Sequence, residues 1–128
     1  MNRVLEFTTD VNFDIVINRN RDLDQTLHCV LREIGMEEEM NFDFSLYEEA
    51  IMHVKKRHDD LNVALTLNTV NGTIQFLDKG ILKFKAEPSY LKKIRAGEYV
   101  YDLYLYGNGF TKRQFISGKF IVKDTTTN

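Results

Sequence analysis

The sequence lacks several features that mark specialised classes of protein. It has one cysteine, Cys29, which excludes an internal disulfide and predicts folding in a reducing cytoplasm. No apolar run follows Met1, and none approaches the roughly 18 residues of a membrane span, so we expect neither a signal peptide nor a membrane anchor. Lys and Arg number 17 against 19 Asp and Glu, a balance that predicts no general attraction to nucleic acid or anionic membrane.

The chain also lacks the residue spacings that catalytic and metal sites need. His53 and His58 are five residues apart, which on a helix would turn them to different faces. His28 and Cys29 are neighbours, so on a strand they point to opposite sides. Asp102 stands in an apolar and aromatic strand, where we expect it to point outward or to accept hydrogen bonds. We therefore predict no catalytic residues, no metal, no cofactor and no enzymatic activity.

The most consistent pattern lies in residues 96–122, which predict one long β-hairpin. Residues 98–106 alternate in period two and are rich in strand formers, and the face with Leu103 and Leu105 is expected to be buried. Gly107, Asn108 and Gly109 suit a tight reversal, and residues 111–123 return with a second alternation.

The rest of the chain predicts further short elements. Residues 11–33 alternate around a polar turn at 19–22 and predict a second hairpin, and Asn71-Gly72 predicts another. Residues 46–58 predict a helix of about three turns, because apolar residues fall at helical spacing after a capping pair, Ser45 and Glu48. Asp78-Lys79-Gly80 predicts a turn, and Pro88 predicts the start of a one-turn helix.

Together these elements predict one all-β domain over residues 1–128. The fold class is an antiparallel β-sandwich, Ig-like or jelly-roll-like, of about eight strands with one or two short helices. The helix near residues 46–58 is an insertion in this sandwich. Its sheets have exposed edges, which must be covered or paired.

Large aromatic side chains on both faces of residues 98–106 suggest an interface. Tyr99 and Tyr101 share a face with Leu103, whereas Tyr104 and Tyr106 lie on the other, and one small core cannot receive both faces. Tyrosine is favoured at protein interfaces because its ring buries area while its hydroxyl still finds a partner. The hypothetical interface consists of Tyr99, Tyr101, Tyr104, Tyr106 and Phe110. The alternative is that the helix over residues 46–57 covers the second face.

Several segments carry a resemblance to a known family. The stretches KKIRAGEYVYDL at residues 92–103 and FISGKFIV at residues 115–122 resemble small β-sandwich modules of bacteriophage and prophage tails. These modules include some similar to the N-terminal domain of baseplate upper proteins. Residues 13–17, 22–24 and 27–32 resemble the first strand pair of that family, although their turn lacks its glycine.

The resemblance implies a role in a virion. The resemblance implies that the protein is a non-enzymatic structural component of a phage tail or baseplate, an adaptor that docks neighbouring subunits or fibres. It implies several copies, other virion proteins as partners, no nucleic acid or membrane partner, and assembly in the host cytoplasm. A receptor- or carbohydrate-binding β-sandwich is one alternative, favoured by exposed tyrosines and by polar loops at 18–24 and 107–109. A neck or capsid decoration protein is another.

Overall fold

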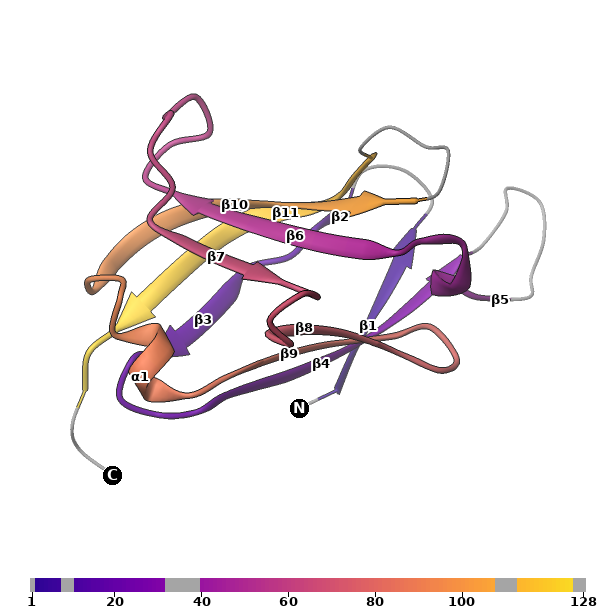
Figure 1. Ribbon diagram of the computed structural model, residues 1–128, viewed down its shortest axis with the longest axis horizontal. Coiled ribbons are helices and arrows are strands. Elements are labelled where there is room, and N and C mark those ends of the chain that lie inside the picture. Colours follow the sequence, from indigo (N-terminus) through magenta and orange to yellow (C-terminus); the bar gives the residue numbers. More distant parts are fainter. Residues whose placement is uncertain (1, 8–10, 32–39, 108–112, 126–128) are drawn as a thin grey trace.

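A computed structural model describes residues 2–7, 11–31, 40–107 and 113–125 and shows two β-sheets facing each other (Figure 1). The five-stranded sheet has the order β1 (Asn2–Phe7), β4 (Leu23–Leu31), β9 (Ile81–Ala86) and β8 (Ile74–Leu77), and β5 (Met40–Asn41) pairs with β4. In the six-stranded sheet, β2 (Val11–Asn12) and β3 (Ile15–Asn18) pair along β11 (Arg113–Lys123), followed by β10 (Gly97–Tyr106), β6 (Glu49–Lys55) and β7 (Leu65–Asn68). Buried side chains from both sheets form one hydrophobic cluster between them.

The all-β sandwich predicted from the sequence is confirmed, with two differences in detail. The described residues contain eleven strands rather than about eight, and two of these strands are only two residues long. The pairing is not wholly antiparallel, because β1 runs parallel to β4, and β2 and β3 run parallel to β11. The helices are short: a 3-10 turn, η1 (Phe44–Leu46), and α1 (Pro88–Leu91), in which Pro88 occupies the first turn as predicted.

The long C-terminal hairpin is also confirmed. Strands β10 and β11 pair antiparallel, with Tyr101 opposite Gly118 and a bulge between Leu103 and Tyr104. Leu103 and Leu105 are fully buried, as their alternation predicts. Of the predicted turn residues, Asn108 and Gly109 lie outside the described residues.

Gly118 lets the backbone between β2 and β3 lie directly against β11. A Cβ at this position would lie 2.3 Å from the carbonyl oxygen of Phe13, which shows how close the two segments are. The Phe13 N–H donates to the Ser117 carbonyl at 2.9 Å, and the Lys119 N–H donates to Asp14 Oδ1 at 3.0 Å. The Tyr101 hydroxyl crosses from β10 to donate to the Phe13 carbonyl. The glycine of the FISGKFIV segment therefore has a packing role.

The helix predicted near residues 46–58 is wrong, because Glu49–Lys55 is strand β6. Ala50, Met52 and Val54 are buried and alternate with partly exposed residues, the period of a strand. The strand has partners on both sides, β10 and β7, and these two hydrogen-bonded ladders outweigh a local helical spacing. The Ser45 N–H donates to Asp43 Oδ1 at 2.9 Å, so Asp43 rather than Ser45 caps the short turn η1.

Two predicted hairpins are wrong for a common reason. Strands β3 and β4 belong to different sheets, so residues 19–22 cross between the layers. Strands β7 and β8 are also in different sheets, and Asn71-Gly72 joins them, with Gly72 at a φ of 82°. The turn at residues 78–80 does join a true hairpin, β8 with β9, and within this three-residue connection Lys79 and Gly80 both have positive φ values, 63° and 76°.

Candidate docking surface

The outward side of the six-stranded sheet carries the described residues of the predicted second aromatic face. We call it the outer sheet face and define it by half-exposed side chains of β10 and β6 with Gln114 of β11: Ile51, His53, Val100, Asp102, Tyr104, Tyr106 and Gln114. Strand β6 lies beside β10 within the sheet, so the segment expected to cover this face as a helix does not cover it. Both tyrosines keep part of their surface accessible.

The five predicted interface residues fall into three places. Tyr99 and Tyr101 are only 6% and 1% exposed and belong to the core, because their period-two phase is that of Leu103. The Tyr99 hydroxyl donates to the Arg95 carbonyl at 2.9 Å, which satisfies it inside the protein. Tyr104 and Tyr106 lie together on the outer sheet face, and Phe110 lies outside the described residues.

Asp102 is at the centre of the polar contacts on this face. Gln114 Nε2 donates to its Oδ1 at 3.1 Å, and His58 Nδ1 lies 3.1 Å from its Oδ2. The Asp102 side chain is 15% exposed, so these two partners compensate part of its desolvation. This outward position with hydrogen bonds confirms the interpretation made from the sequence. The contact with His58 is an ion pair only when the imidazole is protonated.

Tyr104 is held by its neighbours on the same face. Its ring meets the His53 ring edge to face, with centroids 6.4 Å apart. Partial burial, then the charge of Asp102, then Tyr106 raise the pKa of the Tyr104 hydroxyl, which therefore stays protonated at neutral pH. A protonated phenol can both donate and accept, which suits a protein partner. The sequence missed Ile51 and His53 as members of this face, because their segment was interpreted as helical.

The described residues do not assemble a metal site. They contain no group of three His, Cys, Asp or Glu side chains that could hold an ion. His28 lies on the other sheet, with Nε2 at 2.6 Å from Asn41 Oδ1. Cys29 is buried, and desolvation raises the pKa of its thiol to about 12, so the reactive thiolate is suppressed at neutral pH.

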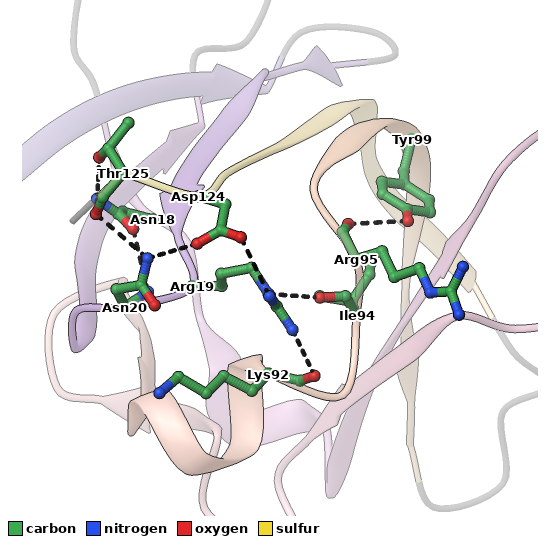
Figure 2. A network of polar contacts seen from close by, with 9 residues as sticks. All are labelled: Asn18, Arg19, Asn20, Lys92, Ile94, Arg95, Tyr99, Asp124 and Thr125. Atoms are coloured by element: carbon green, nitrogen blue, oxygen red, sulfur yellow. Dashed lines mark hydrogen bonds and ion pairs between the residues drawn. The ribbon is translucent and has the colours of Figure 1, made fainter.

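A second polar cluster lies at the end of the sandwich where the chain leaves β11 (Figure 2). Arg19 donates from Nε to the Ile94 carbonyl at 2.9 Å and from Nη2 to the Lys92 carbonyl at 2.8 Å, at the end of α1. Its Nη1 also lies 3.3 Å from Asp124 Oδ2. Asn20 Nδ2 donates to Asp124 Oδ1 at 2.6 Å, and this bond, with Arg19 nearby, lowers the pKa of Asp124. The side chains of Arg19 and Asn20 thus connect the segment between β3 and β4 to the end of α1 and to the residues that follow β11.

Among the grooves on the described part of the surface, two have linings that suit a ligand or a partner. One, of about 490 Å³, lies near η1 and the β8–β9 turn and is lined by aromatic side chains including Phe44, Tyr47 and Phe76. The other, of about 760 Å³, is lined mainly by polar side chains, among them Asp22 and Asn71, around Tyr90.

Within the part of the chain that the structure describes, no helix is long and apolar enough to span a bilayer.

Comparisons with known proteins place the fold. No protein-family model matches the chain, and no curated protein matches it by sequence. Among solved structures, the N-terminal domain of ORF48 from phage TP901-1 is similar, with a TM-score of 0.52 and 15% identity over 97% of this chain and 100% of that chain. Extracellular domains 3–5 of Drosophila OTK align over 90% of this chain and 33% of that chain, but a TM-score of 0.28 at 14% identity carries no argument. The chain therefore shares, over nearly its full length, the fold of a phage protein domain.

Proposed function

We propose that this protein is a non-enzymatic structural component of a bacteriophage virion, an adaptor in the tail or baseplate that docks neighbouring subunits or fibres. The observation that carries the proposal is the fold likeness to a phage domain over 97% of the chain. The resemblance of residues 92–103 and 115–122 to tail and baseplate modules supports it separately, because it rests on residue patterns rather than on backbone shape.

The outer sheet face is the surface by which such an adaptor would bind its neighbour. Tyr104, Tyr106 and Ile51 supply apolar area on a rigid sheet, and Asp102 and His53 supply polar groups beside them. This mixture of aromatic area and polar groups is typical of protein interfaces. Other virion proteins, present in several copies and assembled in the host cytoplasm, are the proposed partners.

The test uses particles of a phage that encodes the protein. Mass spectrometry of purified particles should detect it, and immunogold labelling should place it at the tail or baseplate. A double variant, Tyr104→Ser with Tyr106→Ser, should lower its incorporation, whereas Lys83→Ser on the opposite sheet should not. Absence of the wild-type protein from particles would overturn the proposal, and labelling at the neck or capsid would favour a decoration protein instead.

The polar groove of about 760 Å³ favours a second candidate function, carbohydrate or receptor binding. Its carboxylate side chains, Asp22 and Asp24, can accept hydrogen bonds from sugar hydroxyls, and the half-buried ring of Tyr90 lies in the same groove. The Asn18–Asn20 part of the neighbouring loop is engaged in internal contacts, which leaves the groove as the site for this function. A glycan array with wild-type protein and with Asp22→Ala tests it, and no binding to any glycan would exclude it.

A further inference from the structure

The Asn71-Gly72 pair lies in the crossover between β7 and β8, and hydrogen bonds fix its conformation. Asn71 is exposed to solvent, whereas Thr73, two residues later, is only 7% exposed. The Asn71 N–H donates to Asn68 Oδ1 at 2.8 Å, and the Asn71 side chain makes further hydrogen bonds through both its oxygen and its nitrogen. These contacts hold the side-chain amide of Asn71 in one orientation.

Two donors from Thr73 converge on the side-chain oxygen of Asn71. The Thr73 N–H donates to Asn71 Oδ1 at 3.0 Å, and the Thr73 hydroxyl donates to the same oxygen at 2.6 Å. The hydroxyl also lies 3.2 Å from the Asn68 carbonyl, but its single hydrogen favours the shorter contact. Two donors on one carbonyl oxygen are the arrangement that stabilises an oxyanion when a nucleophile attacks the carbonyl carbon.

The backbone nitrogen of Gly72 is a nucleophile placed next to this carbonyl by the chain itself. Its attack on Asn71 Cγ closes a five-membered ring, and an intramolecular attack of this kind carries a large entropic advantage. Gly72 has no Cβ to shield the nitrogen. Its N–H makes no hydrogen bond within the described part of the chain, so no acceptor is lost when the proton leaves.

The amide nitrogen of Asn71, which would be the leaving group, is held only weakly. Asn71 Nδ2 donates to the Tyr90 hydroxyl at 3.3 Å, at the long end of the range for a hydrogen bond. Because Asn71 is exposed, water can protonate the departing nitrogen and can later reach the ring.

We infer that Asn71 is a site of spontaneous deamidation that the fold promotes. Hydroxide takes the proton of the Gly72 N–H, the nitrogen attacks Asn71 Cγ, and the negative charge passes to Oδ1, where both Thr73 donors receive it. The Cγ–Nδ2 bond then breaks, water returns a proton to the nitrogen, and ammonia leaves a succinimide ring behind. A second water opens the ring at either carbonyl and gives aspartate or isoaspartate. The net change consumes one water, releases one ammonia and needs no oxidant or reductant.

The reaction changes the charge of the polar groove. Asn71 lines this groove together with Asp22, Asp24, Glu87 and Lys85, three carboxylates against one lysine, a net charge of −2. A carboxylate at position 71 makes it −3. The inference goes beyond the proposed role in a virion and does not depend on it, because the reaction needs only the folded chain.

Peptide mapping by mass spectrometry, after incubation of the purified protein at pH 8, tests the inference. The reference is a synthetic peptide of residues 66–76 in the same buffer, which has the same Asn-Gly-Thr sequence without the fold. Mapping also separates Asn71 from the second Asn-Gly pair at residues 108–109. Asn71 should lose its amide faster in the folded protein than in the peptide, because the fold holds both Thr73 donors on Oδ1. A peptide that reacts as fast as the protein, or faster, would overturn the inference.

Two substitutions of Thr73 test the part played by its hydroxyl. Thr73→Val removes the hydroxyl donor but keeps the N–H, and should slow deamidation of Asn71 about tenfold or more. Thr73→Ser keeps both donors and is the matched control, so its rate should match the wild type. Rates are compared in buffer in which circular dichroism shows each variant folded, and if Thr73→Val does not fold, the comparison with the peptide decides. Equal rates for the two variants would overturn the inference, whereas neither result bears on whether particles contain the protein.

Discussion

Replacing Gly118 by alanine tests the claim that the FISGKFIV glycine is needed for packing. The added methyl group would lie 2.3 Å from the Phe13 carbonyl oxygen, 2.8 Å from its carbon and 3.1 Å from Asp14 Oδ1. Two of these atoms are backbone, so the clash cannot be relieved by a side-chain rotation. The segment between β2 and β3 must instead move away from β11.

The cost follows from the contacts that this movement breaks. They are the bond from Phe13 N–H to the Ser117 carbonyl, the bond from Lys119 N–H to Asp14, and the bond from the Tyr101 hydroxyl to the Phe13 carbonyl. Each contributes about 1 kcal/mol, so the free energy of unfolding should fall by about 3 kcal/mol. For a chain of this size the melting temperature should fall by roughly 10 °C.

A double-mutant cycle of Gly118→Ala and Tyr101→Phe, measured by urea unfolding, gives the coupling free energy between these two positions. Tyr101→Phe alone should cost about 1 to 2 kcal/mol, and less when alanine at position 118 has already broken the hydroxyl bond. The control is Gly72→Ala, because Gly72 has a φ of 82° but no atom within 4 Å of the added carbon, so only backbone strain of roughly 1 kcal/mol is expected. A Gly118→Ala variant as stable as the wild type, or fully additive effects, would refute the reasoning.

Three further predictions concern stability. Thr73→Val should lower the free energy of unfolding by about 1 to 3 kcal/mol, because the Asn68 N–H donates to the Thr73 hydroxyl at 2.8 Å and would lose its acceptor. An unchanged midpoint of urea unfolding would contradict this. Arg19→Lys should lower it by about 1 kcal/mol, because an ammonium cannot reproduce the guanidinium fork that binds the Ile94 carbonyl; a thermal melt equal to the wild type would exclude that role. Burial raises the pKa of Cys29 from 9.0 to about 12, so between these pH values the folded state keeps a proton that the unfolded state loses. The free energy of unfolding should therefore be unaffected by this thiol below pH 9 and should decline as the pH rises from 9 towards 12. Correspondingly, Ellman's reagent at pH 8 should label Cys29 slowly in the native protein and quickly in urea, and rapid native labelling would show an accessible thiolate.

The sequence was sufficient where a pattern and its partner are close in the chain. The β10–β11 hairpin, the turn at Lys79-Gly80 and the start of α1 at Pro88 were all predicted, because their determinants are alternation, positive φ and a fixed proline φ. The same alternation correctly placed Tyr104 and Tyr106 on a different face from Leu103. These are local properties of the backbone and need no knowledge of distant residues.

The predictions from the sequence were wrong where the strand that pairs with a segment lies far along the chain. Segment 46–58 has apolar residues at both periods: Ala50, Ile51 and Val54 fit a helix, whereas Ala50, Met52 and Val54 fit a strand. Pairing with β10 and β7 decides for the strand, and these pairings depend on residues far along the chain. The membership of Ile51 and His53 in the outer sheet face was therefore not predictable.

By itself, the sequence determined the all-β class, the long hairpin and which face of β10 is buried, because side-chain alternation and turn residues act over a few positions. Only the tertiary structure decided that residues 19–22 and 69–73 cross between sheets rather than close hairpins, since a turn residue sets the direction of the chain but not the strand that it meets.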